Sequence, residues 1–158
     1  MTTINAVEQS IQTLEVRKDV QIAAPVEITF QAILDELGPE GQMPDGKAFP
    51  MKIEPWPGGR WYRDLGNNTG HFWGHVQVIK PPALLEICGP LFMSYPAISH
   101  VQYRLAPEGD GTRLKLVHRA MGQITEEHSK GVHQGWDAGI ERIRELADRR
   151  KNASRMGR

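Results

Sequence analysis

Six histidines and one cysteine are the residues of this sequence best suited to bind a metal or transfer a proton. His71 and His75 lie four residues apart on one side of a predicted strand, roughly 13 Å apart along it. That separation is too long for two ligands of one metal ion. His128 and His133 lie five residues apart in a predicted helix, a spacing that does not align them. We therefore predict no metal site.

His118 is the histidine that could contact a ligand. Strand alternation puts Leu114, Leu116 and His118 on one face. If that face is concave, the imidazole lies among apolar side chains and could bond a ligand carbonyl or hydroxyl. The alternative is a core histidine bonded by a neighbouring backbone group. No carboxylate stands where it would suggest a partner in proton transfer, so we predict no catalytic role.

Arg63 and Tyr103 are two further polar residues that could reach the same interior. Arg63 alternates with Trp61, and Tyr103 alternates with Val101, along two predicted strands. A guanidinium facing a ligand carboxylate would be a strong anchor. The alternative places Arg63 on the convex face or pairs it with Asp64.

Aromatic and aliphatic residues around these groups either line a pocket or fill a core. The residues that we predict to line a cavity are Phe30, Leu34, Trp61, Arg63, Phe72, Val76, Phe92, Val101, Tyr103, Leu116, His118, Trp136 and Ile140.

Sequence motifs for other kinds of chemistry are absent. There is no Gly-x-Gly-x-x-Gly, Walker loop, Gly-x-Ser-x-Gly, Cys-x-x-Cys or His-Glu-x-x-His pattern. We therefore predict neither catalytic residues nor a cofactor. Cys88 falls on a predicted strand, which favours an inert buried thiol over a reactive one.

Composition limits the classes of protein to consider. The chain has 158 residues, the size of one domain, and 39% of them are hydrophobic, enough for a core. Nineteen basic and nineteen acidic residues give no net charge, which argues against nucleic acid as a partner. No apolar run is long enough to span a membrane. The single cysteine and the absence of a signal peptide favour a cytoplasmic protein.

Hydrophobic periodicity gives the elements that must position these side chains. We expect a strand over residues 14–22, a helix from Pro25 to Leu37 ended by Gly38, and a long helix over 125–149 with one apolar stripe. Between the helices, prolines and glycines favour short antiparallel strands. They are predicted at residues 51–54, 59–65, 71–79, 84–88, 98–106 and 112–121.

The ends of the chain are expected to lie outside the domain. We predict a loose lead-in over residues 1–12, a single domain over 13–149 and a basic tail over 150–158. The tail is expected to be solvated, the alternative being a weak contact with an anionic partner. Gly131, Gly135 and Gly139 recur every four residues in the long helix. Because glycine lowers helix propensity, we expect the helix to approach the sheet closely at Gly135.

Four stretches, in this order, resemble a known family. They are Trp56-Pro57-Gly58-Gly59-Arg60-Trp61, then Gly74-His75-Val76 with Ile79-Lys80-Pro81-Pro82, then residues 105–114, then Gly135-Trp136 ahead of Ile140, Ile143 and Leu146. They resemble bacterial proteins of the Hsp90-ATPase-activator-homologue type, in the START/Bet v 1-like (SRPBCC) superfamily, over about residues 14–148. The resemblance implies an α+β helix-grip fold, in which a curved antiparallel sheet of six to seven strands surrounds the long helix and leaves a cavity.

Three functions are compatible with this resemblance. The first is binding of a small hydrophobic or amphipathic molecule, such as a lipid, between sheet and helix, without catalysis. The second is an enzyme acting on an aromatic or polyketide-like compound, as a cyclase does. The third is interaction with a chaperone, although the eukaryotic activators carry an N-terminal chaperone-binding domain where this sequence has only a short lead-in. Ligand binding is the function that we expect.

Overall fold

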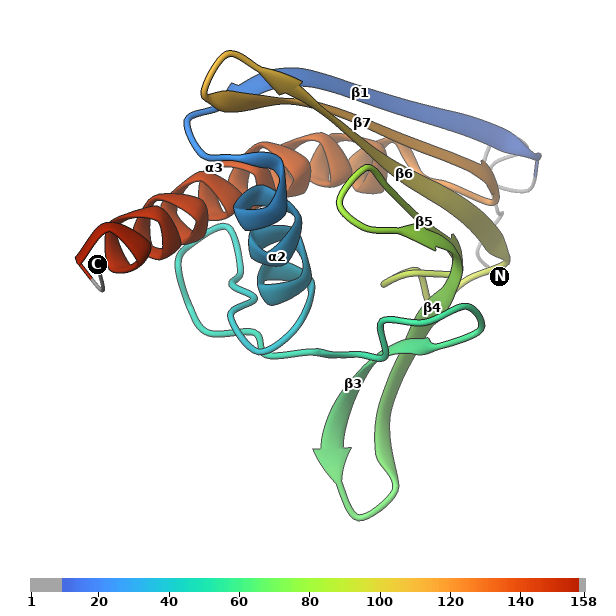
Figure 1. Cartoon of the computed structure of the whole chain (residues 1–158). Helices are drawn as coiled ribbons and strands as arrows, with labels where there is room; N and C mark the ends of the chain where they lie inside the picture. The colour runs from blue at the N-terminus through green and yellow to red at the C-terminus, as the bar shows by residue number, and fades with distance from the viewer. Residues whose placement is uncertain (1–9, 157–158) are drawn as a thin grey trace, which may run out of the picture.

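Seven strands form one antiparallel sheet that curls around a long C-terminal helix (Figure 1). The computed structural model describes residues 10–156, so the predicted lead-in lies largely outside the described residues. The elements are β1 (Gln12–Ile22), α2 (Val26–Leu37), β2 (Lys52–Ile53), β3 (Arg60–Gly66), β4 (Thr69–Lys80), β5 (Leu84–Gly89), β6 (Ala97–Glu108), β7 (Gly111–Gly122) and α3 (Glu126–Met156). The α+β helix-grip fold predicted from the sequence is confirmed.

The strand order is β1-β7-β6-β5-β4-β3-β2, so the first strand of the chain pairs with the last. Every predicted strand is present, with each end within two residues of the prediction. The connections between β3 and β4 and between β6 and β7 are tight hairpins. Asn67 and Asn68 both have positive φ, at 52° and 58°, and join β3 to β4 through the kind of two-residue turn that matches strand twist.

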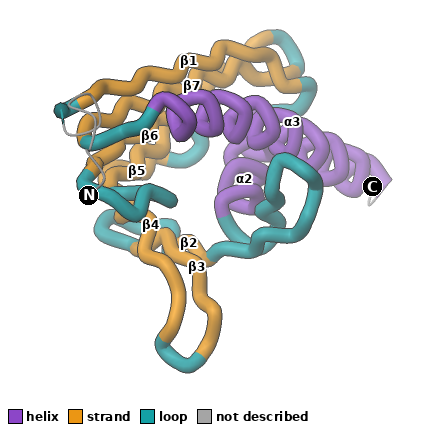
Figure 2. Tube along the Cα trace, turned by 180° about the vertical axis from the view of Figure 1, so that it is seen from behind, coloured by secondary structure: helices purple, strands orange, loops and turns teal. Residues whose placement is uncertain are grey.

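The two helices lie on the concave side of the sheet and pack against each other (Figure 2). α2 buries Thr29, Phe30, Ala32, Ile33 and Leu37, which recur at helical spacing. Its C-terminal end is joined to β3, because Trp61 Nε1 donates a 2.7 Å hydrogen bond to the carbonyl of Leu37. α2 therefore covers one side of α3 and closes one end of the space inside the sheet.

The basic segment predicted as a solvated tail is part of α3, which continues to Met156. Arg150 Nε donates a 2.7 Å hydrogen bond to Asp35 of α2. Lys151 Nζ donates a bond of the same length to the carbonyl of Ala23. These contacts with the start and side of α2 explain why the helix does not end at Arg149. Among residues 10–156, no helix has the length and apolar character that crossing a membrane requires.

Candidate functional site

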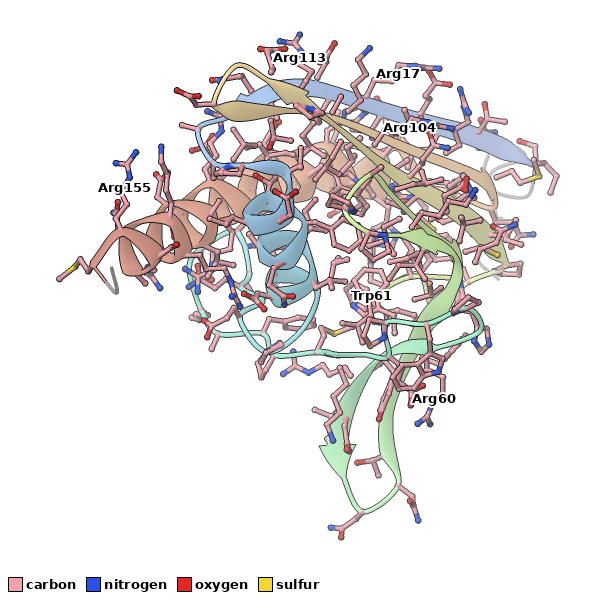
Figure 3. All side chains as sticks on the ribbon, in the orientation of Figure 1. Arg17, Arg60, Trp61, Arg104, Arg113 and Arg155 are labelled. Atoms are coloured by element: carbon pink, nitrogen blue, oxygen red, sulfur yellow. The ribbon has the colours of Figure 1, made fainter. Side chains whose placement is uncertain are left out.

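The space between the sheet and α3 contains most of the predicted cavity residues. Side chains from α2, the sheet and α3 meet there in one apolar cluster. Its buried members include Phe30, Trp61, Val76, Val101, Tyr103, Leu116 and Ile140, and Leu34 and Trp136 pack against it half-buried. The inward position of Trp61 contrasts with that of its neighbour Arg60, which points to solvent (Figure 3). The inward facing that strand alternation predicts for Trp61, Val101, Tyr103 and Leu116 is therefore the one observed.

Two predicted cavity residues lie elsewhere. Phe72 is 45% exposed on the outer side of β4, where its ring is 4.8 Å from that of His75. Trp73 faces the core instead, and so does Val76, three residues later. The regular alternation is interrupted at this point by a register shift between β3 and β4. Phe92 is 42% exposed in the loop after β5, beyond the strands from which its facing could be inferred.

His118 is fully buried, and both of its ring nitrogens are hydrogen-bonded within the protein. Trp136 Nε1 lies 2.9 Å from His118 Nδ1 and can only donate, so Nδ1 carries no proton. In the neutral ring Nε2 therefore carries the hydrogen, which it donates to Ser99 Oγ at 2.9 Å. Burial, with a smaller contribution from His133, lowers the pKa of His118 to about 4. The ring is bonded by two side chains, and not by the backbone group of the alternative considered for a core histidine.

Of the two positions considered for Arg63, the inner side of β3 is the one that corresponds to its contact with Phe49, which packs against the apolar cluster. Its guanidinium carbon lies 3.7 Å from the ring centroid of Phe49, a cation–π contact. Asp64, the alternative partner, is bonded by Lys52 at 3.0 Å instead. Nη1 of Arg63 is buried and has no hydrogen-bond partner within residues 10–156.

Tyr103 presents a second unpartnered group to the interior. Its side chain is completely buried, with its ring centroid 6.2 Å from that of Trp136, in an edge-on arrangement. Its hydroxyl has no hydrogen-bond partner in the described part of the chain. Burial raises the pKa of this hydroxyl well above its usual value, and the charge of Glu36 adds to the effect. The phenol is therefore protonated at any physiological pH.

Glu36 is the polar residue of this interior that the sequence analysis missed. It follows Ile33 by three residues and Ala32 by four, so it lies beside the buried stripe of α2, and the residue as a whole is half-buried. Oε2 is buried and unpartnered among the described residues, and Oε1 lies 3.4 Å from where a Cβ on Gly139 would be. Burial raises the pKa of Glu36 to about 8, despite the opposing charge of Arg142. An acidic residue beside an apolar stripe was the signal available in the sequence.

Arg142 cannot serve as a full counter-ion for Glu36, because other groups occupy its guanidinium. Nε donates to the carbonyl of Glu40 at 3.1 Å, and Nη2 donates to the Glu40 carboxylate at 3.1 Å. Nη1 donates to Glu145 at 3.0 Å. Arg142 thus ties α3 to the segment after α2 and leaves Glu36 without a hydrogen bond to a cation.

The glycines of α3 do not mark a close approach to the sheet, contrary to the prediction. A Cβ added to Gly131 or Gly135 would meet no atom within 4 Å. At Gly139 the nearest atom belongs to Glu36 of α2, not to the sheet. At Gly139, α2 covers this side of α3. One turn earlier, at Gly135 and next to Trp136, the same side of the helix is not covered.

The loop between β5 and β6 borders this part of α3. Tyr95 of the loop stacks on His128, with ring centroids 5.1 Å apart, and its hydroxyl lies 2.8 Å from His128 Nδ1. Met93 packs with Val132 in a second apolar cluster. The N-terminal half of α3 is thus held by a loop, whereas its C-terminal half is held by α2.

A comparison with protein families identifies a match over most of the chain. The family described as "Activator of Hsp90 ATPase homolog 1-like protein" matches residues 23–148. The chain belongs to this family. None of the curated proteins that were compared matches it.

Solved structures similar to this Hsp90-ATPase-activator-like chain share its fold at low sequence identity. A protein from Rhizobium leguminosarum is 16% identical, with a TM-score of 0.68 over 89% of this chain and 97% of that chain. A protein from Nitrosomonas europaea is 21% identical, with a TM-score of 0.63 over 95% and 100%. Ara h 8.0201 is 12% identical, with a TM-score of 0.62 over 87% and 98%. These similarities place the chain in the Bet v 1-like helix-grip fold.

Two surface depressions of this family member lie away from the predicted cavity residues. One, of about 590 Å³, lies between the start of α2, the β6–β7 turn and the end of α3. The other, of about 380 Å³, is lined by residues of β1, β4, β5, β6 and β7, including Cys88 and His100. Cys88 is only partly buried there, so the predicted buried thiol reaches the surface. The two buried oxygens without a hydrogen-bond partner in the described residues, on Glu36 and Tyr103, do not line either depression.

Proposed function

We propose that the protein binds one small apolar or amphipathic molecule between the sheet and α3, and does not chemically change it. The observation that carries this proposal is the pair of buried oxygens, Tyr103 Oη and Glu36 Oε2, that have no hydrogen-bond partner within the described residues. Leaving such a group unsatisfied costs about 1–3 kcal/mol. A ligand with one polar group would recover part of this cost.

The apolar contacts of such a ligand would come from the half-buried residues around the pair. Trp136 and Leu34 pack against the apolar cluster without being fully enclosed. A Bet v 1-like sheet and helix are a suitable frame, because small-molecule sites are mostly apolar and carry few polar groups. Binding is favoured over catalysis because His118, the histidine closest to Trp136, has both ring nitrogens occupied.

The uncovered side of α3 at Gly135 is the route of entry in this proposal. Gly135 is half-buried and adjoins Trp136, whereas Gly131, one turn earlier, is exposed. A side chain added at Gly135 would therefore obstruct the route, and one at Gly131 would not. Both glycines lie in the same helix, so leucine raises helix propensity equally at the two positions.

The test is a titration with the neutral fluorescent probe N-phenyl-1-naphthylamine. We expect saturable binding of one probe per chain, at least tenfold weaker in Gly135→Leu and unchanged in Gly131→Leu. Absence of saturable binding to the parent protein would refute the proposal. Equal affinities of the parent and both variants would refute the route past Gly135.

A further inference from the structure

The interior still contains groups that can donate a hydrogen bond once the existing bonds are counted. Trp136, His118 and Ser99 form a chain in which the indole N–H donates to one imidazole nitrogen and the other imidazole nitrogen donates to the hydroxyl. Those three groups are engaged with one another. The buried oxygens that remain without hydrogen-bond partners in the described structure are Tyr103 Oη and Glu36 Oε2, and Arg63 Nη1 and Arg144 Nε are the nitrogens.

Glu36 is neutral because its carboxyl group is buried and no cation is bonded to it in the described structure. An isolated carboxylate is expensive to bury, so it takes up a proton unless a cation binds it. Arg142, the basic group whose charge acts on Glu36, donates to Glu40 and Glu145 instead. The other titratable group that interacts with Glu36 is Tyr103, from β6, which is itself uncharged. Glu36 therefore presents a carboxylic O–H.

Glu36 and Tyr103 lie close enough for the charge of one to affect the pKa of the other. The Gly139 Cβ position lies 3.4 Å from Glu36 Oε1 and 3.8 Å from Trp136 Cε3. The Tyr103 ring packs edge-on against the same indole. Both residues therefore border the indole of Trp136, and we place the ring of an aromatic or alicyclic ligand beside it.

We propose that Glu36 and Tyr103 donate hydrogen bonds to one carbonyl oxygen of the ligand, so that the molecule bound is a cyclic, apolar ketone or aldehyde. This inference rests on the proposed function and adds the chemical class of the ligand. A neutral carboxylic acid beside a tyrosine hydroxyl is an effective pair of donors for such an oxygen in an apolar site. The pair selects against a molecule of the same shape that lacks the oxygen, because both donors would stay unsatisfied.

Three naphthalenes of nearly equal shape test this specificity. The ketone is 2-acetylnaphthalene, the hydrocarbon is 2-isopropenylnaphthalene, and the cation is 1-(2-naphthyl)ethylamine. Dissociation constants are measured at pH 6.5 by isothermal titration calorimetry. In the parent protein we expect the ketone to bind about tenfold more tightly than the hydrocarbon, with the amine weakest.

Substitutions of Glu36 and Tyr103 test whether the two side chains act as hydrogen-bond donors or whether Glu36 acts as a negative charge. Glu36→Gln keeps a neutral donor, its amide N–H. Its preference for the ketone is expected to stay within about threefold of the preference of the parent protein. Glu36→Leu and Tyr103→Phe each remove one donor and should reduce the preference to about threefold or less. Tyr103→Phe removes only an unpartnered hydroxyl, so this variant is expected to fold as the parent does.

The other outcomes would overturn the carbonyl assignment alone, or the carbonyl assignment together with the proposed binding function. Equal affinity of ketone and hydrocarbon in the parent would overturn the carbonyl assignment and leave the binding function intact. Tightest binding of the amine, lost in Glu36→Gln, would show that Glu36 acts as an anion and would also overturn the assignment. Failure of all three compounds and of N-phenyl-1-naphthylamine to bind would overturn the proposed function as well.

Discussion

Trp136 in α3 donates a hydrogen bond of 2.9 Å to His118 in β7, so the long helix is joined to the concave face of the sheet by a buried polar contact. The same histidine continues the connection to Ser99 in β6. This chain fixes the rotation of α3, because a helix turned by one residue would move the indole away from the ring.

Loss of the indole N–H should destabilise the protein. Trp136→Phe leaves His118 Nδ1 buried without a donor, so we expect the free energy of unfolding to fall by about 1–3 kcal/mol. Urea denaturation followed by circular dichroism measures the change. Tyr95→Phe is the matched control, since it removes only a contact with the exposed residue His128. A Trp136→Phe variant as stable as the control would contradict the role of the bond.

The imidazole of His118 should remain neutral far below the usual range. Its pKa in the folded protein is about 4, against 6.5 for an unperturbed histidine. Because the folded pKa is lowered, protons bind preferentially to the unfolded chain, and His118 makes stability fall as pH drops from about 6.5 towards 4. An NMR titration of the imidazole resonances measures the pKa directly. A midpoint near 6.5 for His118 would contradict the two hydrogen bonds described.

The opposite pH dependence is expected of Glu36. Its pKa is 4.5 in the absence of interactions and about 8 in the folded protein, so folding favours its protonated form. The contribution is fully present below pH 4.5 and is lost as pH rises towards 8, by at most about 1.4 kcal/mol per pH unit. Burial raises this pKa, and the charge of Arg142 in α3 opposes the rise.

The variant Glu36→Gln isolates this contribution from that of His118, which both proteins share. Free energies of unfolding are compared between pH 5 and 8.5 for the parent and the variant. The parent should lose stability relative to Glu36→Gln as pH rises, and the difference should level off above pH 8. Parallel curves for the two proteins would mean that Glu36 is ionised in the folded state throughout.

Two alanine substitutions in α3 test where the helix is covered. Gly135→Ala adds a Cβ with no atom within 4 Å and should raise stability by about 1 kcal/mol through helix propensity. Gly139→Ala gains the same propensity but places its Cβ 3.4 Å from Glu36 Oε1, so most of the gain should be lost. Thermal denaturation of both variants gives the comparison. Equal gains would show that α2 does not press on α3 at Gly139.

Much of the fold could be predicted from the sequence because strand alternation and helical stripes report burial directly. Trp61, Val101 and Leu116 face inward as their alternation requires. The prediction for Phe72 was wrong because a register shift between β3 and β4 falls between Phe72 and Val76, so the two residues do not share a face, and no single residue type encodes that shift.

The candidate site was harder to predict than the fold. Glu36 was overlooked since acidic residues in helices usually face solvent, and its burial depends on a glycine in a distant helix, Gly139. The partners of His118 likewise come from β6 and α3, far along the chain. Sequence periodicity gives the face on which a side chain lies, but hydrogen bonds between distant elements follow only from the packed structure.

The most direct test of the central claim is a two-dimensional ¹H–¹⁵N NMR titration of the four tryptophan indole N–H groups with N-phenyl-1-naphthylamine. Trp136 lies beside Glu36 and Tyr103, whereas Trp56 is 55% exposed outside this interior and serves as an internal control. Binding between the sheet and α3 predicts a saturable shift of the Trp136 signal with the Trp56 signal unchanged. A Trp136 signal that stays in place while the probe binds, or a shift confined to Trp56, would contradict the claim.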